Sequence, residues 1–356
     1  MKILKSFLTG AALFSLIFGA SSCNDSFIFE DERDCTVKVQ FVFKKHRQAL
    51  HQIPGKEADV FASTVNTVHL FVYDAESGEL VSEHIEKAEN LNSAAELKMG
   101  SGTDKCYLPL NLDPGKYRMV AWCGLDEDDT NNAFYLTDGS TRGKYAECRV
   151  KLSDATGHPV NSAKYDALYH GIVKEAEVSV SNDGTQVIPV ELTKNNNDIA
   201  VWVQHTTTTF SEGEYEVVYT DANGTLKFED NSVPAENHLE YHPHTTSMLT
   251  SSTEYNGSSV EAGALVAHLS TSRLMEAHQN NARIEVRNKE GETVFSIPFI
   301  KYLLQMQTFT NDGQYYLDCE DTFNCSFYLT GENGAWIPAR IIINNWVKVP
   351  DQDADI

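Results

Sequence analysis

Hydrophobic and polar residues alternate at every second position along much of this chain. In Thr36–Phe43 every second residue is apolar, while Lys38 and Gln40 lie between them. Because successive side chains of a strand point to opposite faces, this pattern predicts a strand with one buried face. Only 272–279 and 299–306 are predicted to be helical. The pattern predicts further strands at 65–73, 79–81, 106–112, 116–123, 178–180, 187–192, 199–203, 215–219, 226–228, 284–286, 294–299, 327–329 and 339–349.

Turn residues separate these strands at short intervals. Asp113-Pro114-Gly115 joins two of them, because proline fixes one turn dihedral and glycine accepts a positive one. Ser181 to Gly184 and Asn223-Gly224 are further hairpin signals. Many short strands with such turns predict an all-β protein built from sandwiches. The polar, threonine-rich stretch 205–213 suggests a boundary between two tandem Greek-key β-sandwich domains, 35–205 and 206–356.

The N-terminus has the layout of an export signal. Lys2 and Lys5 precede an apolar run, small residues follow at 20–22, and then comes Cys23. We expect residues 1–22 to be a signal peptide, Cys23 to receive a lipid after cleavage, and 23–34 to be an acidic tether. The apolar run is shorter than the roughly 20 residues that span a bilayer. The alternative is an ordinary secreted protein in which Cys23 lies near the cleavage point by chance.

The charge of the chain limits its partners. A formal net charge of −23 disfavours nucleic acid, whose phosphates would repel the protein. Anionic lipid would repel it as well, so we expect the lipid on Cys23 to hold the membrane. We expect no cofactor.

The remaining six cysteines allow disulfides in an exported protein. Cys319 and Cys325 flank a short acidic turn and could join the two arms of a hairpin. The alternative for the apolar positions Cys106 and Cys123 is that they are buried thiols. There is no C-x-x-C pair, so the sequence gives no support for thioredoxin-like or zinc-ribbon chemistry.

No group of residues makes a persuasive catalytic or metal site. Three histidines could bind zinc if a strand aligned them, but in a polar loop they are more simply surface residues. An acidic run could supply oxygen ligands for calcium, but it lacks the spacing of a calcium loop. The tryptophans could stack on sugars or lie in the core. These residues are His238, His242 and His244; Asp126 to Asp129; and Trp122, Trp202, Trp336 and Trp346. We expect no metal site and no enzymatic activity.

Four groups of motifs follow one another along the chain. They are Leu112 to Tyr117 (L-D-P-G-K-Y) followed by Trp122-Cys123-Gly124, Val190 to Trp202, Tyr315 to Asp321 followed by Phe327 to Leu329, and Ile341 to Trp346 (I-I-I-N-N-W). In this order they resemble the FimB-type fimbrial anchor lipoproteins of Bacteroides-like bacteria, and the resemblance covers essentially the whole chain after the signal peptide. One departure is Cys319, where that family often has arginine.

The resemblance implies transthyretin-like sandwiches and a structural role in cell-surface fimbriae at the outer membrane. Partners would be other fimbrial subunits, joined by strand addition, for which we expect an edge near 341–356. In related stalk and tip subunits a trypsin-like protease removes the first strand and opens a groove for a partner strand. Here a cut at Arg33 would release the lipid and leave the first strand in place. Anchor, tip and accessory roles all remain open. The alternative function is a surface lipoprotein that binds glycans for an outer-membrane transporter.

Overall fold

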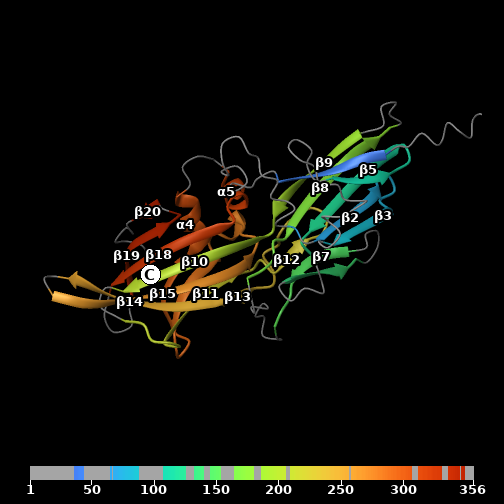
Figure 1. Cartoon of the computed structure of the whole chain (residues 1–356). Coiled ribbons are helices and arrows are strands. Elements are labelled where there is room, and N and C mark those ends of the chain that lie inside the picture. The colour runs from blue at the N-terminus through green and yellow to red at the C-terminus, as the bar shows by residue number, and fades with distance from the viewer. Residues whose placement is uncertain are drawn as a thin grey trace, which may run out of the picture.

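The fold consists almost entirely of β-strands, as the alternating pattern predicted (Figure 1). The computed structural model describes residues 36–43, 65, 67–87, 107–125, 132–139, 145–153, 164–179, 186–205, 209–255, 258–306, 312–330, 336–344 and 346–348. The strands of the first part are β1 (Thr36–Phe43), β2 (Thr67–Asp74), β3 (Leu80–Lys87), β4 (Tyr107–Asn111), β5 (Gly115–Cys123), β6 (Phe134–Asp138), β7 (Tyr145–Val150), β8 (Tyr169–Val178) and β9 (Gln186–Lys194). Those that follow are β10 (Asn196–His205), β11 (Tyr215–Asp221), β12 (Thr225–Lys227), β13 (Leu239–Tyr241), β14 (Thr245–Tyr255), β15 (Ser258–Ser272), β16 (Arg283–Asn288), β17 (Thr293–Pro298), β18 (Thr322–Thr330), β19 (Ile337–Ile343) and β20 (Trp346–Lys348).

The helices of the described residues are few and short. Helix α4 (Phe299–Met306) has the bounds predicted from the sequence, and 272–279 contains only the 3₁₀ turn η2 (Glu276–His278). Helix α5 (Gly313–Cys319) was not predicted. It begins at Asp312, whose carboxylate accepts a hydrogen bond from the Tyr315 amide, which is a standard way to start a helix. None of these helices is long and apolar enough to cross a membrane.

The first seven-stranded sheet folds back on itself. Its order is β3-β2-β5-β8-β9-β1-β4, and β8 pairs with β9 only at Tyr169, His170 and Gly171. A Cβ atom on Gly171 would lie 2.5 Å from Val190 Cγ1, so glycine permits the close approach at this corner. The two limbs of the sheet enclose a core of apolar side chains from β1, β2, β4, β5 and β9.

Strand β1 lies inside this sheet. It runs parallel to β9 on one side and antiparallel to β4 on the other. Its alternate residues Val37, Val39 and Phe41 are 1%, 0% and 2% exposed. The first described strand is therefore part of the core of this sheet.

A six-stranded sheet, β14-β15-β10-β18-β19-β20, and a four-stranded sheet, β13-β11-β16-β17, form the other large group. Apolar residues of β10, β15, β18 and β19 share a core cluster with those of β11, β16 and β17. Strand β10 has the same kinds of neighbours in this sheet as β1 has in the first sheet. It lies between an antiparallel neighbour, β15, and a parallel neighbour, β18.

The chain changes sheets at Asn195, because β9 belongs to the first sheet and β10 to the second. The boundary suggested at residue 205 therefore separates β10 from the sheet that contains it. Asn195, Asn196 and Asn197 are all buried. Asn195 exchanges two 2.8 Å hydrogen bonds with the side chain of Asn231.

The side chains of the other two asparagines form hydrogen bonds with backbone groups. Asn196 Oδ1 accepts from the Leu168 amide at 2.9 Å, and Asn197 Nδ2 donates to the Glu320 carbonyl at 2.8 Å. The polar side chains at the crossover thus bond to backbone groups that precede β8 in the first sheet and β18 in the second. Buried amides require such partners, so the geometry of the crossover is fixed.

A strand that follows β10 in the chain joins a sheet formed by two strands that precede it. Strand β12 pairs with β7 and so joins the three-stranded sheet β12-β7-β6. The next residue, Phe228, is buried against Phe71, with ring centroids 5.1 Å apart, and stacks on Trp122 at 6.2 Å. Its carbonyl accepts hydrogen bonds from Trp122 Nε1 at 3.3 Å and from His170 Nε2 at 3.0 Å. The two groups of sheets therefore share a contiguous core.

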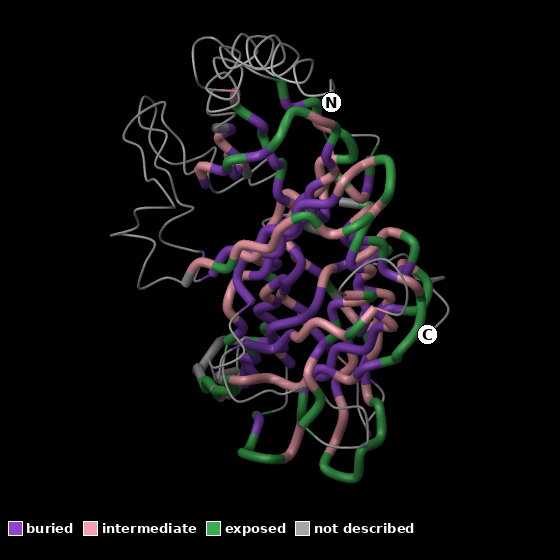
Figure 2. The backbone as a smooth tube through the Cα atoms, turned by 90° about the vertical axis from the view of Figure 1, so that its right-hand side faces the viewer, coloured by how far each residue is buried: buried purple, intermediate pink, exposed green. Residues whose placement is uncertain are grey.

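Ion pairs lie on the same junction. Arg273 makes a two-pronged contact with Asp318, at 2.9 and 2.7 Å, and also donates to the Asn231 carbonyl at 3.0 Å. Lys194 at the end of β9 lies 3.2 Å from Asp321, just before β18. Both pairs are largely buried (Figure 2 shows buried residues gathered along the inner strands).

The shared core predicts that truncating Phe228 destabilises both groups of sheets. Phe228→Ala should lower the free energy of unfolding by about 3–5 kcal/mol, because it leaves a cavity between the aromatic rings. Hydrogen exchange should become faster in β5 and β8 as well as in β11 and β16. The neighbouring variant Glu229→Gln, which changes a largely exposed side chain, should cost about 0.5 kcal/mol or less. A loss of protection confined to one group of sheets would contradict the prediction.

The buried His170 predicts that stability falls in acid. Burial lowers the pKa of His170 from 6.5 to about 4, although the Phe228 carbonyl opposes the shift. The unfolded chain therefore binds more protons between these two values, and stability decreases as the pH falls from about 6.5 to 4, by on the order of 3 kcal/mol. Urea unfolding at a series of pH values measures this slope. His170→Gln keeps a donor for the carbonyl without titrating and should flatten the curve in this window; an unchanged slope would exclude His170 as the cause.

Candidate functional site

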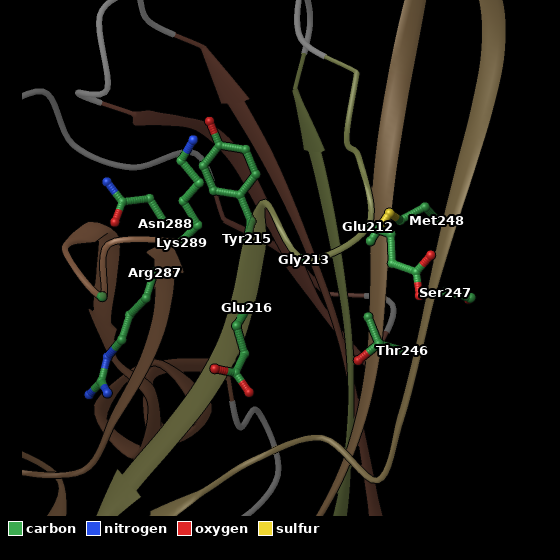
Figure 3. Close-up of a pocket in the computed structure, with 11 residues that line it drawn as sticks. Glu212, Gly213, Tyr215, Glu216, Thr246, Ser247, Met248, Arg287, Asn288 and Lys289 are labelled. Atoms are coloured by element: carbon green, nitrogen blue, oxygen red, sulfur yellow. The ribbon is translucent and has the colours of Figure 1, made fainter.

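A pocket of about 670 Å³ lies between the two sheets of the second group (Figure 3). One wall is formed by Tyr215 and Glu216 of β11 together with Arg287 of β16. The facing wall is formed by β14, where Thr246, Ser247 and Met248 line the pocket. The remaining lining residues are Glu212, Gly213, Asn288, Lys289 and Gly291. The pocket is therefore bounded by strands of two different sheets.

The pocket exists because the chain leaves one sheet for the other at Pro243. Strand β13 pairs with β11 only at Tyr219, Thr220 and Asp221, and proline has no amide with which to extend the ladder. The next residue, His244, already bonds through its amide to the His268 carbonyl of β15. The edge of β11 at Tyr215 to Val218 is left without β13, and β14 diverges from it. The pocket fills this opening.

Ion pairs neutralise most of the charge around the pocket. Arg287 contacts both oxygens of Glu240 at 3.1 and 3.0 Å and also bonds to Glu285, and these bonds raise its pKa. His242 Nδ1 lies 2.8 Å from Glu216 Oε1, and this hydrogen bond raises the pKa of His242. The Tyr215 ring, on the apolar side of the pocket, packs on Trp336 with ring centroids 4.7 Å apart. A ligand in this pocket would be recognised by its shape and by hydrogen bonds.

The three histidines considered as zinc ligands do not form a cluster. His242 pairs with Glu216, His244 Nδ1 lies 3.1 Å from Thr245 Oγ1, and His238 is an exposed residue just before β13. Burial lowers the pKa of His244, opposite to the shift of His242, so the two occupy different environments. Among the described residues, no three metal-binding side chains come together. The acidic run Asp126 to Asp129 lies outside those residues.

The predicted hairpin between Cys319 and Cys325 is not present. Cys319 is the last residue of α5, whereas Cys325 lies in β18 and is buried in the core. Both are thiols in this structure. Cys123 is buried, as expected for an apolar strand position. Cys23, Cys35, Cys106 and Arg33 lie outside the described residues.

The sequence also matches a protein family. The family "Fimbrillin-A associated anchor proteins Mfa1 and Mfa2" matches residues 31–351, which is most of the chain. The chain belongs to this family of fimbrial anchor proteins. The match confirms the resemblance that the motif order indicated, and it associates the protein with fimbriae at the cell surface.

Several solved structures share the fold of this chain. A candidate adhesin of Bacteroides thetaiotaomicron is 24% identical, with a TM-score of 0.68, and the match covers 88% of this chain and 97% of the other. Proteins of the same organism described as candidates for polysaccharide binding are 20% identical, with a TM-score of 0.67 and coverage of 90% and 100%.

The fimbrial anchor protein Mfa2 of Porphyromonas gingivalis is 17% identical, with a TM-score of 0.58 and coverage of 88% and 99%. At these identities the three comparisons establish the fold. None of the curated proteins matches the chain.

Two of the four tryptophans of this anchor-family chain lie in the core. Trp122 and Trp336 are buried, and Trp202 in β10 is 38% exposed. Trp346 begins β20, and its side chain lies outside the described residues. Of the three described side chains, only Trp202 reaches solvent. Among the described side chains, therefore, no pair of exposed tryptophans comes together, as an aromatic sugar-binding groove would require.

The pocket wall predicts a measurable link between Glu216 and His242. Glu216→Gln removes the carboxylate that favours the protonated imidazole, so the pKa of His242 should fall toward 6.5. Histidine NMR titration of the full chain measures this shift. His244 provides an internal control, because burial and not Glu216 is the main cause of its lowered pKa. Equal shifts of both histidines would point to a general change in the fold.

Proposed function

We propose that this protein is a non-enzymatic, lipid-anchored subunit that fixes a fimbria to the outer membrane and limits its length. The match of residues 31–351 to the anchor family carries the proposal. Two features of the chain add support. The N-terminal sequence has the layout of an export signal that stops before Cys23. In the fold that follows, the first strand is paired within its own sheet.

The position of Cys23 gives the proposed anchor its physical basis. A lipid on this residue would precede β1 by only the acidic tether, so the membrane attachment and the core strand would belong to one continuous segment. The acyl chains would have to provide the attachment, because a chain with a net charge of −23 gains nothing from anionic lipid.

The burial of β1 explains how such a subunit would end a fibre. A subunit that receives a neighbour's strand in place of its own must first lose its first strand. Here Val37, Val39 and Phe41 fill the core, and β1 pairs on both sides. With β1 in place this groove is occupied, so growth at that position stops. A cut at Arg33 would free the fold from the lipid and leave β1 in the sheet.

The glycan-binding alternative has weaker support. It would need aromatic side chains gathered on a solvent-facing groove, and Trp202 is the one exposed tryptophan whose side chain the structure describes. The pocket between β11 and β14 contains one aromatic residue, Tyr215, whose ring is engaged with Trp336. Normal fibres together with impaired growth on a polysaccharide in a deletion strain would favour this alternative.

The proposed function predicts that the lipid retains the fibres. In a strain that carries Cys23→Ala, fibres should appear in the medium, whereas wild-type cells should keep them on the surface. Electron microscopy of cells and immunoblots of the supernatant measure this distribution. Cys35→Ala is the matched control, because it removes the next cysteine outside the signal region and should leave the fibres attached. Fibres that stay on Cys23→Ala cells would overturn the anchor role.

A further inference from the structure

Strand β14 lacks the usual protections of an exposed sheet edge. Natural edge strands are kept from pairing with other chains by charged residues, proline, bulges or short length. Strand β14 is eleven residues long, contains no lysine or proline, and has Glu254 as its one charged residue. Its register with β15 runs without a shift from Thr245 to Tyr255. It therefore presents a long, regular edge to solvent.

The other edges of the described sheets are all protected. Strand β3 combines charged residues with a register shift, and β4 contains Pro109. Strands β6 and β17 each lie beside a register shift, and β17 also ends in Pro298. Strands β12, β13 and β20 have three residues each. This contrast within one chain singles out β14.

The outer part of β14 also lacks support from its own sheet. The pairing between β10 and β15 starts at Gly263. Residues 251–255 of β14 pair with residues 258–262 of β15, which have no pairing with β10, so this outer part is a two-stranded ribbon. Figure 1 shows this ribbon extending past the neighbouring strands. Two-stranded ribbons are marginally stable alone. A third strand along β14 would supply the missing partner.

The pocket lies directly beside this edge. Thr246, Ser247 and Met248 belong both to β14 and to the pocket wall. A strand that pairs with β14 would point every second side chain toward the opening between β14 and β11. Three of the four charged lining residues, Arg287, Glu216 and Lys289, each lie against an ionisable partner, which favours uncharged side chains in this opening. Backbone pairing with an adjacent pocket is how β-augmentation combines affinity with specificity.

We propose that β14 receives an extended strand of another fimbrial subunit, with a row of uncharged side chains seated in the pocket. The identity of the partner rests on the proposed function. A second copy of this chain is a poorer occupant, because two chains with a net charge of −23 repel each other. The surface differs from the edge expected near 341–356, since β20 ends the same sheet on its opposite side.

Hydrogen exchange with intact fibres tests the assignment. The probe is fibres collected from a strain that lacks this protein, mixed with the purified full chain. Amides of 246–255 should exchange more slowly in the mixture, while those of β3 and β20 should not change. Protection at β20 or β3 instead, or fibre binding without protection of 246–255, would overturn the β14 assignment and leave the anchor role intact. Failure of the fibres to bind at all would contradict both proposals.

Charged substitutions provide the second arm of the experiment. Thr246→Lys places a cation beneath the incoming strand, on the pocket wall that faces Arg287 and Lys289, and should weaken fibre binding by about tenfold or more. Val81→Lys adds a lysine at an exposed position of the protected edge strand β3, which lies in a different sheet from the pocket, and should leave binding within about twofold. Equal melting temperatures would show that both variants fold. Equal binding by the two variants, or a dimer of the chain alone in size-exclusion chromatography, would contradict the proposal.

Discussion

Three consecutive buried asparagines fix the relation between the two groups of sheets. A buried amide that lacks a hydrogen-bond partner is costly, so a polar run in the interior forces the surrounding backbone into one arrangement. Asn195 binds Asn231, Asn196 binds the segment before β8, and Asn197 binds the backbone before β18. Around this crossover the chain can place β12 against β7 and Phe228 among the aromatic residues of the first sheet. The result is a core that crosses the junction instead of two cores joined by a linker.

The sequence was informative where local pattern decides the structure. Alternation located β1 at its observed bounds, and the apolar segment 299–306 gave α4. It failed where distant partners decide. Residues 194–198 are as polar as an ordinary loop, and only the positions of Asn231 and Glu320 turn them into a buried crossover. The threonine-rich stretch after β10 is equally polar, so composition alone cannot tell which of the two polar segments lies where the chain changes sheets.

The candidate site shows the same division. A proline at position 243 disfavours one continuous strand, but that it separates β13 from β14 depends on which strands those residues join. The cysteines near the C-terminus were interpreted as hairpin partners because a short acidic segment lies between them. Asp312 could have indicated otherwise, since an N-cap residue before a glycine can begin a helix. Edge strands likewise cannot be identified from a single sequence, because a strand is at an edge when no other segment of the chain pairs with that side of it.

The double-sided pairing of β1 has a mechanical consequence. If tension enters through the N-terminus, it acts along the strand, and the ladders to β9 and β4 are loaded in shear. Many hydrogen bonds must then break together, whereas a strand pulled from one end of a hairpin opens one bond at a time. Extraction of β1 would also expose Val37, Val39 and Phe41 to water. The first strand is therefore arranged to bear such a load along its whole length.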